Sequence, residues 1–486
     1  MRCHMVFDNA RLRSRLFTLA VLAGSSFLAG GEEIAPYVPA PRPVVKRSFL
    51  TPDEIEISRP GGEKLLPAKF TTVRDLAGLW KFRGLRTSAR PFKSDVNLNR
   101  GYQNSDYDDS SWSEIKVPLN WYNDPNYSYR KYHNPETPFV LAWYRKEFEL
   151  SPEDLAGRRV RLNFDVIGYE GLVFVNGKKA GTAHGDFVPS SFDVTDLVKP
   201  GRNVMAIRVF SDFQAKSSSG ISNYRTYGAK WWYENVKGGL WQPVSLTLEP
   251  EIRFDKVLVA VNYDARELDI RGTIENHTQD PRSLDLSAFV TDADRENANQ
   301  LDSTGQFGTV KLAPGKTPFA VRLKLRNPKP WAPRDPNLYF LTMTLTDGDR
   351  IVSARPVRFG FRRFEVDGQK FRLNGKPIYL FGENLASTLF GGYDRSPAEE
   401  RQLLEKEIKA RLAAGVVMLR TAHMPATRLV IEVADELGMM IYDEWSYSFS
   451  IPNMDEPRFE KTNSDELARF IERDFNAPSV RSEERR

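Results

Sequence analysis

Residues 416–444, VVMLRTAHMPATRLVIEVADELGMMIYDE, decide the fold of the C-terminal part of the chain. Two short apolar runs, 416–419 and 439–442, flank a predicted helix over 427–437, and Gly438 supplies its C-terminal cap. Parallel strands need a long crossover connection, usually a helix. This alternation of short apolar runs with helices therefore predicts parallel β/α units.

The same alternation extends to both sides of this stretch. Residues 378–381 form a further short apolar run, and the capping box S-P-A-E opens a predicted helix over 396–414. A third helix is predicted to open at Ser464. Because a complete barrel has eight such units, residues 362–486 predict an incomplete (β/α)8 TIM barrel of about three β/α units.

The chain before the predicted barrel has the pattern of strands. Between 67 and 250, short runs such as 143–150 and 160–164 are separated by turn signals, among them Asn176-Gly177. We predict a jelly-roll β-sandwich over 67–250. Strand-like runs recur over 251–361 at the spacing of small sandwiches, which predicts an immunoglobulin-like β-sandwich. The predicted fold class is therefore multi-domain: two sandwiches followed by part of a barrel.

Charge and cysteine content exclude several classes of partner. The 486 residues hold 69 Lys+Arg and 64 Asp+Glu, a formal net charge of +5, and much of the excess lies near the N-terminus. A nearly neutral body without a basic block argues against a nucleic-acid partner. The single cysteine, Cys3, excludes a disulfide within the chain and a thiolate metal site.

Residues 1–31 have the pattern of a secretory signal peptide. Arginines precede an apolar run over 16–29 that is too short to span a bilayer of roughly 30 Å, and Ala29-Gly30-Gly31 offers small residues to a signal peptidase. A short anchor that stays attached is the alternative. We expect a periplasmic or secreted protein with no membrane contact after cleavage, in which the proline-rich residues 32–66 form an extended linker.

Several motifs, in this order along the chain, resemble glycoside hydrolase family 2, which includes β-galactosidases, β-glucuronidases and β-mannosidases. The motifs are LAGLWKF at 76–82, VPLNW at 117–121, VNGK at 175–178, GGLWQPV at 238–244, FGFR at 359–362, LNGKPI at 373–378, RTAHMP at 420–425 and DE at 443–444. The last two resemble the family's R-T-x-H-x-P and D-E motifs at the ends of the second and third barrel strands. Barrel enzymes place their chemistry at these strand ends.

The resemblance implies a glycosidase that hydrolyses terminal β-linked sugars with retention, binds a β-glycoside and needs no cofactor. It further implies that Asn384, Arg420 and His423 line the subsite of the cleaved sugar, and we add Glu444 to this predicted substrate-binding set. Structural roles are the alternatives: Arg420 could pair with Asp443 or Glu444, and His423 could cap the following turn.

The sequence offers no counterpart for the family's two catalytic carboxylates, so we predict no catalytic residue in this chain. A retaining glycosidase needs two carboxylates about 5–5.5 Å apart. In the family the acid/base follows R-D-x-N-H-P-S-V. Here the matching run is RDFNAPSV at 473–480, with Ala477 in place of His, and the polar residues 481–486 follow it. Adjacent Asp443 and Glu444 would point to opposite faces of a strand and cannot flank one bond.

We therefore expect an inactive, truncated fragment whose partial barrel is unstable alone or needs the missing C-terminal portion. The family's magnesium-binding E-x-H is not matched either, since 446–448 is Ser-Tyr-Ser, and no metal site is predicted. Two alternatives stay open. One is a carbohydrate-binding protein that uses the jelly roll and aromatics such as Trp231, Trp232 and Tyr233. The other is one half of a split glycosidase. Homo-oligomerisation is also open.

Overall fold

The computed structural model describes most of the chain after the predicted signal peptide, and all structural statements below refer to these residues. They are 47–57, 65–85, 100–124, 141–210, 238–297, 301–385, 395–421, 425–445 and 459–480. The predicted signal peptide and most of the predicted linker lie outside them. No helix in these ranges is long and apolar enough to cross a lipid bilayer.

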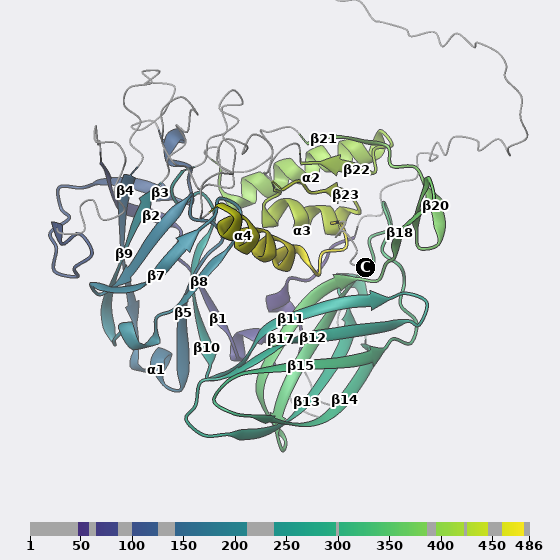
Figure 1. Cartoon of the computed structure of the whole chain (residues 1–486), viewed down its shortest axis with the longest axis horizontal. Helices are drawn as coiled ribbons and strands as arrows, with labels where there is room; N and C mark the ends of the chain where they lie inside the picture. The colour runs from purple at the N-terminus through teal and green to yellow at the C-terminus, as the bar shows by residue number, and fades with distance from the viewer. Residues whose placement is uncertain are drawn as a thin grey trace, which may run out of the picture. The chain divides into compact units, whose positions relative to one another are not determined.

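The first sandwich packs two antiparallel sheets face to face (Figure 1). One sheet has the order β1-β10-β5-β8 and the other β3-β2-β4-β9-β6-β7. A short helix, α1 (Pro152–Leu155), connects β4 to β5. The strands are β1 (Thr72–Asp75), β2 (Gly78–Leu85), β3 (Ser113–Val117), β4 (Leu141–Leu150), β5 (Arg158–Phe164), β6 (Glu170–Val175), β7 (Lys178–His184), β8 (Ser190–Asp193), β9 (Gly201–Phe210) and β10 (Val244–Pro250).

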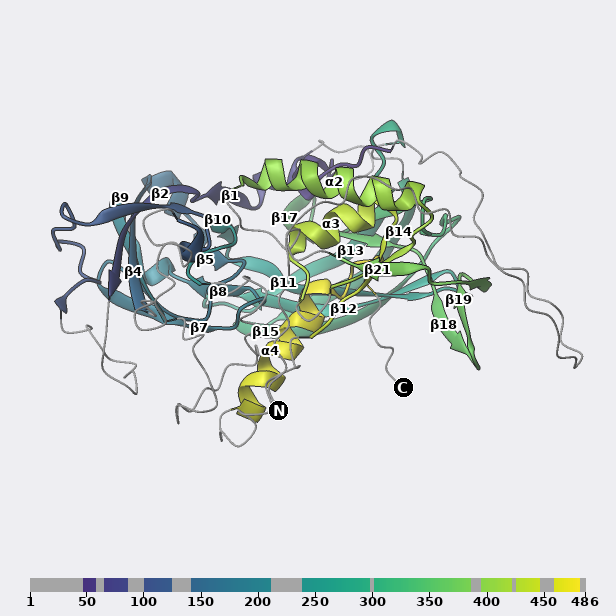
Figure 2. The same ribbon diagram turned by 90° about the horizontal axis from the view of Figure 1, so that it is seen from above.

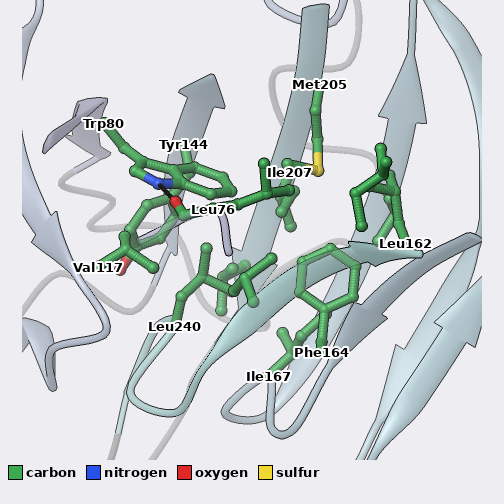
Figure 3. Packing of buried hydrophobic residues seen from close by; sticks show 14 of the residues in the cluster. Leu76, Trp80, Val117, Tyr144, Leu162, Phe164, Ile167, Met205, Ile207 and Leu240 are labelled. Carbon is green, nitrogen blue, oxygen red and sulfur yellow. Dashed lines mark hydrogen bonds between the residues drawn. The ribbon is translucent and has the colours of Figure 1, made fainter. Parts of the chain in front are cut away.

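Alternation of apolar residues explains how the first sandwich closes. In β5, Val160, Leu162 and Phe164 are buried while the residues between them are half-buried, which is the period of two that a strand requires. Figure 3 shows Phe164 in the core with Trp80 and Tyr144 of the opposite sheet. The indole of Trp80 donates to the Leu76 carbonyl at 2.8 Å, so this buried polar group is satisfied.

The second sandwich has the sheets β11-β12-β15 and β14-β13-β16-β17. All but the last residue of β16 are buried, as expected for a central strand between two neighbours. Both predicted sandwiches are thereby confirmed. The strands are β11 (Ile252–Asn262), β12 (Glu267–Asn276), β13 (Arg282–Asp292), β14 (Leu301–Leu312), β15 (Gly315–Lys324), β16 (Leu338–Asp347) and β17 (Arg350–Gly360).

A small antiparallel sheet leads from the second sandwich to the parallel strands. It consists of β18 (Phe364–Asp367), β19 (Lys370–Leu373) and β20 (Lys376–Ile378). Asn374 and Gly375 both have positive φ, 52° and 78°, and turn the chain back on itself between β19 and β20. The predicted parallel strand at 378–381 is therefore wrong, because this hairpin uses Ile378; the first parallel strand follows at Gly382.

The partial barrel consists of three parallel strands and three helices, which confirms the predicted incomplete barrel. The strands β21 (Gly382–Asn384), β22 (Met418–Arg420) and β23 (Met440–Tyr442) pair in this order. The helices are α2 (Pro397–Ala413), α3 (Arg428–Leu437) and α4 (Phe459–Asp474). Helix α4 begins five residues before the predicted Ser464. Figure 2 shows α2 and α3 side by side, and both pack on the sheet face that carries Leu419 and Ile441.

The outer edge of β23 is paired at one point. Ile441 N–H donates to the Ser479 carbonyl at 2.8 Å, and Ile441 forms a parallel bridge with Val480. Arg362 in turn donates to the Val480 carbonyl. The outer edge of β23 is therefore not wholly open, because the end of the RDFNAPSV segment runs beside it.

Candidate functional site

Three of the four predicted sugar-binding side chains meet at the carboxyl ends of the parallel strands. The strand register aligns Asn384 with Arg420. Arg420 Nε donates to Glu444 Oε1 at 2.7 Å, and a second guanidinium nitrogen contacts the same oxygen. Arg420 Nη1 donates to Asn384 Oδ1 at 3.4 Å. The Arg420 side chain is 36% exposed, so a ligand can reach it. The fourth residue, His423, lies outside the described residues.

Asp443 has different partners from its neighbour Glu444. Its side chain is only 2% exposed. It accepts hydrogen bonds from Thr421 Oγ1 at 2.9 Å and from the Ala426 N–H at 2.8 Å, while the Glu444 N–H donates to Thr421 Oγ1. Asp443 therefore ties the two ends of the loop 421–426 together and has a structural role.

Burial dominates the electrostatics of Asp443. Burial and the neighbouring charge of Asp474 together raise the pKa of the carboxyl to about 7, and Arg473 opposes them. Arg473 lies 3.7 Å from Asp443 but is held mainly by Asp474, to which it donates two bonds of 2.8 and 2.5 Å. Asp443 thus receives only partial compensation for its charge.

The described carboxylates at the strand ends are all engaged. Glu383 pairs with Arg411 of α2. Asp443 points into the core, and Glu444 binds Arg420. Among these three, no two lie free on either side of a common space, which is the arrangement that a retaining glycosidase needs.

The two sandwiches hold the segment that follows α4, and sequence reasoning did not foresee this role. Arg473 Nη1 donates to the Phe187 carbonyl of the first sandwich at 2.8 Å. The Asn476 amide donates to the Val257 carbonyl at 3.0 Å and accepts from the Val259 N–H at 2.8 Å. Because β11 is an edge strand, Asn476 satisfies backbone groups that the sheet leaves unpaired.

Asp435 of α3 is a second residue that sequence reasoning missed. Its side chain accepts from the Ser479 N–H at 2.8 Å, and its backbone carbonyl accepts from Trp331 Nε1 at 2.9 Å. Burial raises the pKa of Asp435 to about 7, with Arg358 opposing the shift. The available signal was an acid on the apolar face of the predicted helix, one turn after Ile431.

Other predicted features stay untested. Trp231, Trp232 and Tyr233 lie outside the described residues, as do Ser446–Ser448, which stand where the family has its magnesium ligands. Within the described ranges, no group of three or more His, Cys, Asp or Glu side chains is arranged to hold a metal ion.

The chain has two β-sandwiches before its parallel β/α units, and Asn384, Arg420 and Glu444 lie at the strand ends. This arrangement defines a class of multi-domain barrel proteins with a polar site at the strand ends. Three family models match the chain. The Glycosyl hydrolase 2 galactose-binding domain-like model matches 117–235, the Glycosyl hydrolases family 2 model matches 252–362, and that family's TIM barrel domain matches 364–481. The chain belongs to glycosyl hydrolase family 2.

Curated relatives and solved structures share this organisation. A β-galactosidase of Vibrio vulnificus is 26% identical over 438 residues, which cover 84% of this chain and 39% of that protein. A β-galactosidase of Streptococcus thermophilus is 25% identical over 444 residues, which cover 84% of this chain and 40% of that protein. The chain thus spans about two fifths of the length of these relatives.

Two solved β-glucuronidases have the same fold over most of this chain. The Bacteroides uniformis enzyme aligns with a TM-score of 0.66 at 22% identity, covering 84% of this chain and 46% of that one. The Ruminococcus gnavus enzyme, solved in complex with D-glucuronic acid, aligns with a TM-score of 0.64 at 20% identity, covering 85% and 66%.

Proposed function

We propose that this chain is part of a retaining β-glycosidase, and that the carboxyl ends of β21, β22 and β23 form one side of the subsite for a terminal β-linked sugar. The observation that carries the proposal is the cluster of Asn384, Arg420 and Glu444 at the strand ends, where barrel enzymes place their chemistry. The relatives named β-galactosidase and β-glucuronidase support a β-galactoside or β-glucuronide as the substrate.

Each residue of the cluster has a chemical role in this proposal. Arg420 offers guanidinium N–H groups to sugar hydroxyls or to a sugar carboxylate, and these are strong charge-assisted donors. Asn384 can both donate and accept. Glu444 fixes the Arg420 guanidinium in one orientation, and His423 joins the subsite from the loop that Asp443 holds closed.

We further propose that the 486-residue chain binds the sugar without hydrolysing it. Retention requires an acid/base and a nucleophile, and the carboxylates at the strand ends are engaged in structural contacts. The described strand ends supply neither catalytic group in a free form, so in this proposal both groups lie outside these strand ends. We also propose export to the periplasm or medium, from the pattern of residues 1–31; cell fractionation tests this, and a cytoplasmic product would contradict it.

Calorimetric titration of the purified chain with galactose and with glucuronate tests the binding proposal. At least one sugar should bind, and Arg420→Ala should weaken that binding about 10-fold or more, because a charge-assisted donor is lost. Arg372→Ala removes a half-buried arginine of the β19–β20 hairpin and serves as the matched control. Binding that survives Arg420→Ala unchanged would instead favour the jelly roll as the sugar-binding part.

An aryl β-glycoside assay tests the second half of the proposal. No turnover is expected from the chain alone, because the described residues bring no free pair of carboxylates to the strand ends. Turnover that disappears in Glu444→Gln would show that a carboxylate of this chain takes part in catalysis, and the proposal would be wrong.

A further inference from the structure

A cavity lined by many charged residues lies where both sandwiches and the helices of the partial barrel meet. Its volume is about 1360 Å³, and Asn384, Arg420 and Glu444 do not line it. The described residues around it include ten Lys or Arg side chains and seven Asp or Glu side chains, so its lining carries an excess of positive charge. Such a cavity favours an anionic ligand.

Several of the cationic side chains are already neutralised. Arg473 makes two hydrogen bonds to Asp474, at 2.8 and 2.5 Å. Arg358 donates to Glu436 at 2.6 Å. These pairs leave the two guanidinium groups little donor capacity for a ligand.

Arg355 of β17 is not neutralised in this way. Its Nη1 donates to the Phe254 carbonyl at 2.9 Å, and no carboxylate of a described residue lies within 4 Å of its guanidinium. The side chain lines the cavity, where it is open to water from the cavity side and packed against protein on the others. Burial and the neighbouring charges of Arg253 and Arg428 hold the pKa of Arg355 below its usual value.

Arg428 at the start of α3 is the second incompletely satisfied cation. Its nearest carboxylate oxygens, on Asp165 and Glu432, are 3.6 and 3.8 Å away, which is beyond hydrogen-bonding distance. Its guanidinium makes no hydrogen bond to a described residue, and the side chain is 55% exposed. Arg428 therefore keeps its donors for a ligand in the cavity.

We propose that Arg355 and Arg428 form an oxyanion-binding site in this cavity, which takes a phosphate, a sulfate or the carboxylate of a sugar acid. The planar fork of a guanidinium matches the spacing of two oxygens on such a group. One bound anion would satisfy free N–H groups of both arginines and offset the repulsion between them. The site is separate from the proposed sugar subsite and does not depend on it.

Thermal unfolding of the purified chain with increasing inorganic phosphate, at constant ionic strength, tests this site. The melting temperature should rise by about 2 °C or more and then saturate, because a ligand bound only by the folded state stabilises it. Sulfate should act like phosphate. The same experiment with glucuronate distinguishes between the possible ligands. A comparable rise in melting temperature at a lower concentration would identify a sugar acid as the preferred ligand.

Variants assign the effect to the two arginines. Arg355→Gln and Arg428→Gln should each remove most of the rise, whereas Arg322→Gln, on the exposed face of β15, should keep it. Since Arg428 makes no hydrogen bond to a described residue, Arg428→Gln should fold even if Arg355→Gln does not. The proposal would be overturned by the absence of a saturable rise, or by the same rise in Arg428→Gln as in the parent.

Discussion

At the scale of single residues, the functional cluster and its support differ in exposure. Arg420 is open to a ligand, whereas Asp443 is buried and accepts hydrogen bonds from Thr421 and Ala426. Asp435 has a similar structural role in the segment after α4, because its side chain accepts a hydrogen bond from the Ser479 N–H. Both buried acids have a pKa raised to about 7 and therefore carry their charge at a cost at neutral pH.

The raised pKa values predict that the chain loses stability as the pH rises. Between the ordinary pKa of an aspartate, about 4, and about 7, the folded state holds protons that the unfolded state has released. The free energy of unfolding should therefore fall from pH 5 to pH 8. Asp435→Asn keeps an acceptor for Ser479 and removes the charge, so it should be more stable than the parent by about 1–3 kcal/mol at pH 8.

Urea unfolding of parent and Asp435→Asn at both pH values measures this. The difference between the two proteins should shrink towards pH 5, where the parent's Asp435 is protonated. A difference that is equal at both pH values would show that titration of Asp435 is not its cause.

At the scale of elements, local capping signals predicted the helices better than short apolar runs predicted the strands. Helix α2 begins at the capping box and α3 ends at Gly438 as expected, because these signals act within one turn. The prediction of a parallel strand at 378–381 was wrong because the turn at Asn374-Gly375 pairs Ile378 with β19 in an antiparallel hairpin. The apolar run by itself does not determine which strand it pairs with. The start of α4 was misplaced because a second plausible cap, Ser464, lies inside the helix.

Gly438 gives a test at this scale. Its φ is +71°, and an added Cβ would come within 2.7 Å of the Arg334 nitrogen and 2.9 Å of the Ala332 carbonyl oxygen. Gly348 also has a positive φ, +55°, but a Cβ there would have open space. Gly438→Ala should therefore destabilise the chain by about 1–3 kcal/mol more than Gly348→Ala in urea unfolding. Equal losses of stability in the two variants would show that the Ala332–Arg334 loop accommodates the added methyl group without strain.

At the scale of the whole molecule, the two sandwiches contribute directly to the partial barrel. Asn384 and Arg420 were predicted from the resemblance to the family's strand-end motifs, and they lie together because parallel strands bring their carboxyl ends to one edge. The supporting contacts of Arg473 and Asn476 could not be predicted, because their partners are backbone groups more than 200 residues away in sequence. Only the assembled sandwiches bring those groups to the barrel.

Asn476→Ala tests this buttressing. It leaves the Val257 carbonyl and the Val259 N–H of edge strand β11 without their partner, so the chain should lose about 2 kcal/mol. Hydrogen exchange should become faster in α4 and in 475–480 but not in β13. Asn163→Ala, which breaks side-chain contacts within the first sandwich, is the control and should leave exchange in α4 unchanged. The same exchange in α4 for both variants would contradict the role given to Asn476.

The most direct measurement for the whole account is a crystal structure of this chain with the sugar that binds it in solution. We expect the sugar at the carboxyl ends of β21–β23, within hydrogen-bonding distance of Arg420 and Asn384, with intact substrate if an aryl β-glycoside is soaked in. A sugar bound only on the first sandwich, or a cleaved glycoside beside Glu444, would contradict the central claim that these strand ends bind a terminal sugar but do not hydrolyse it.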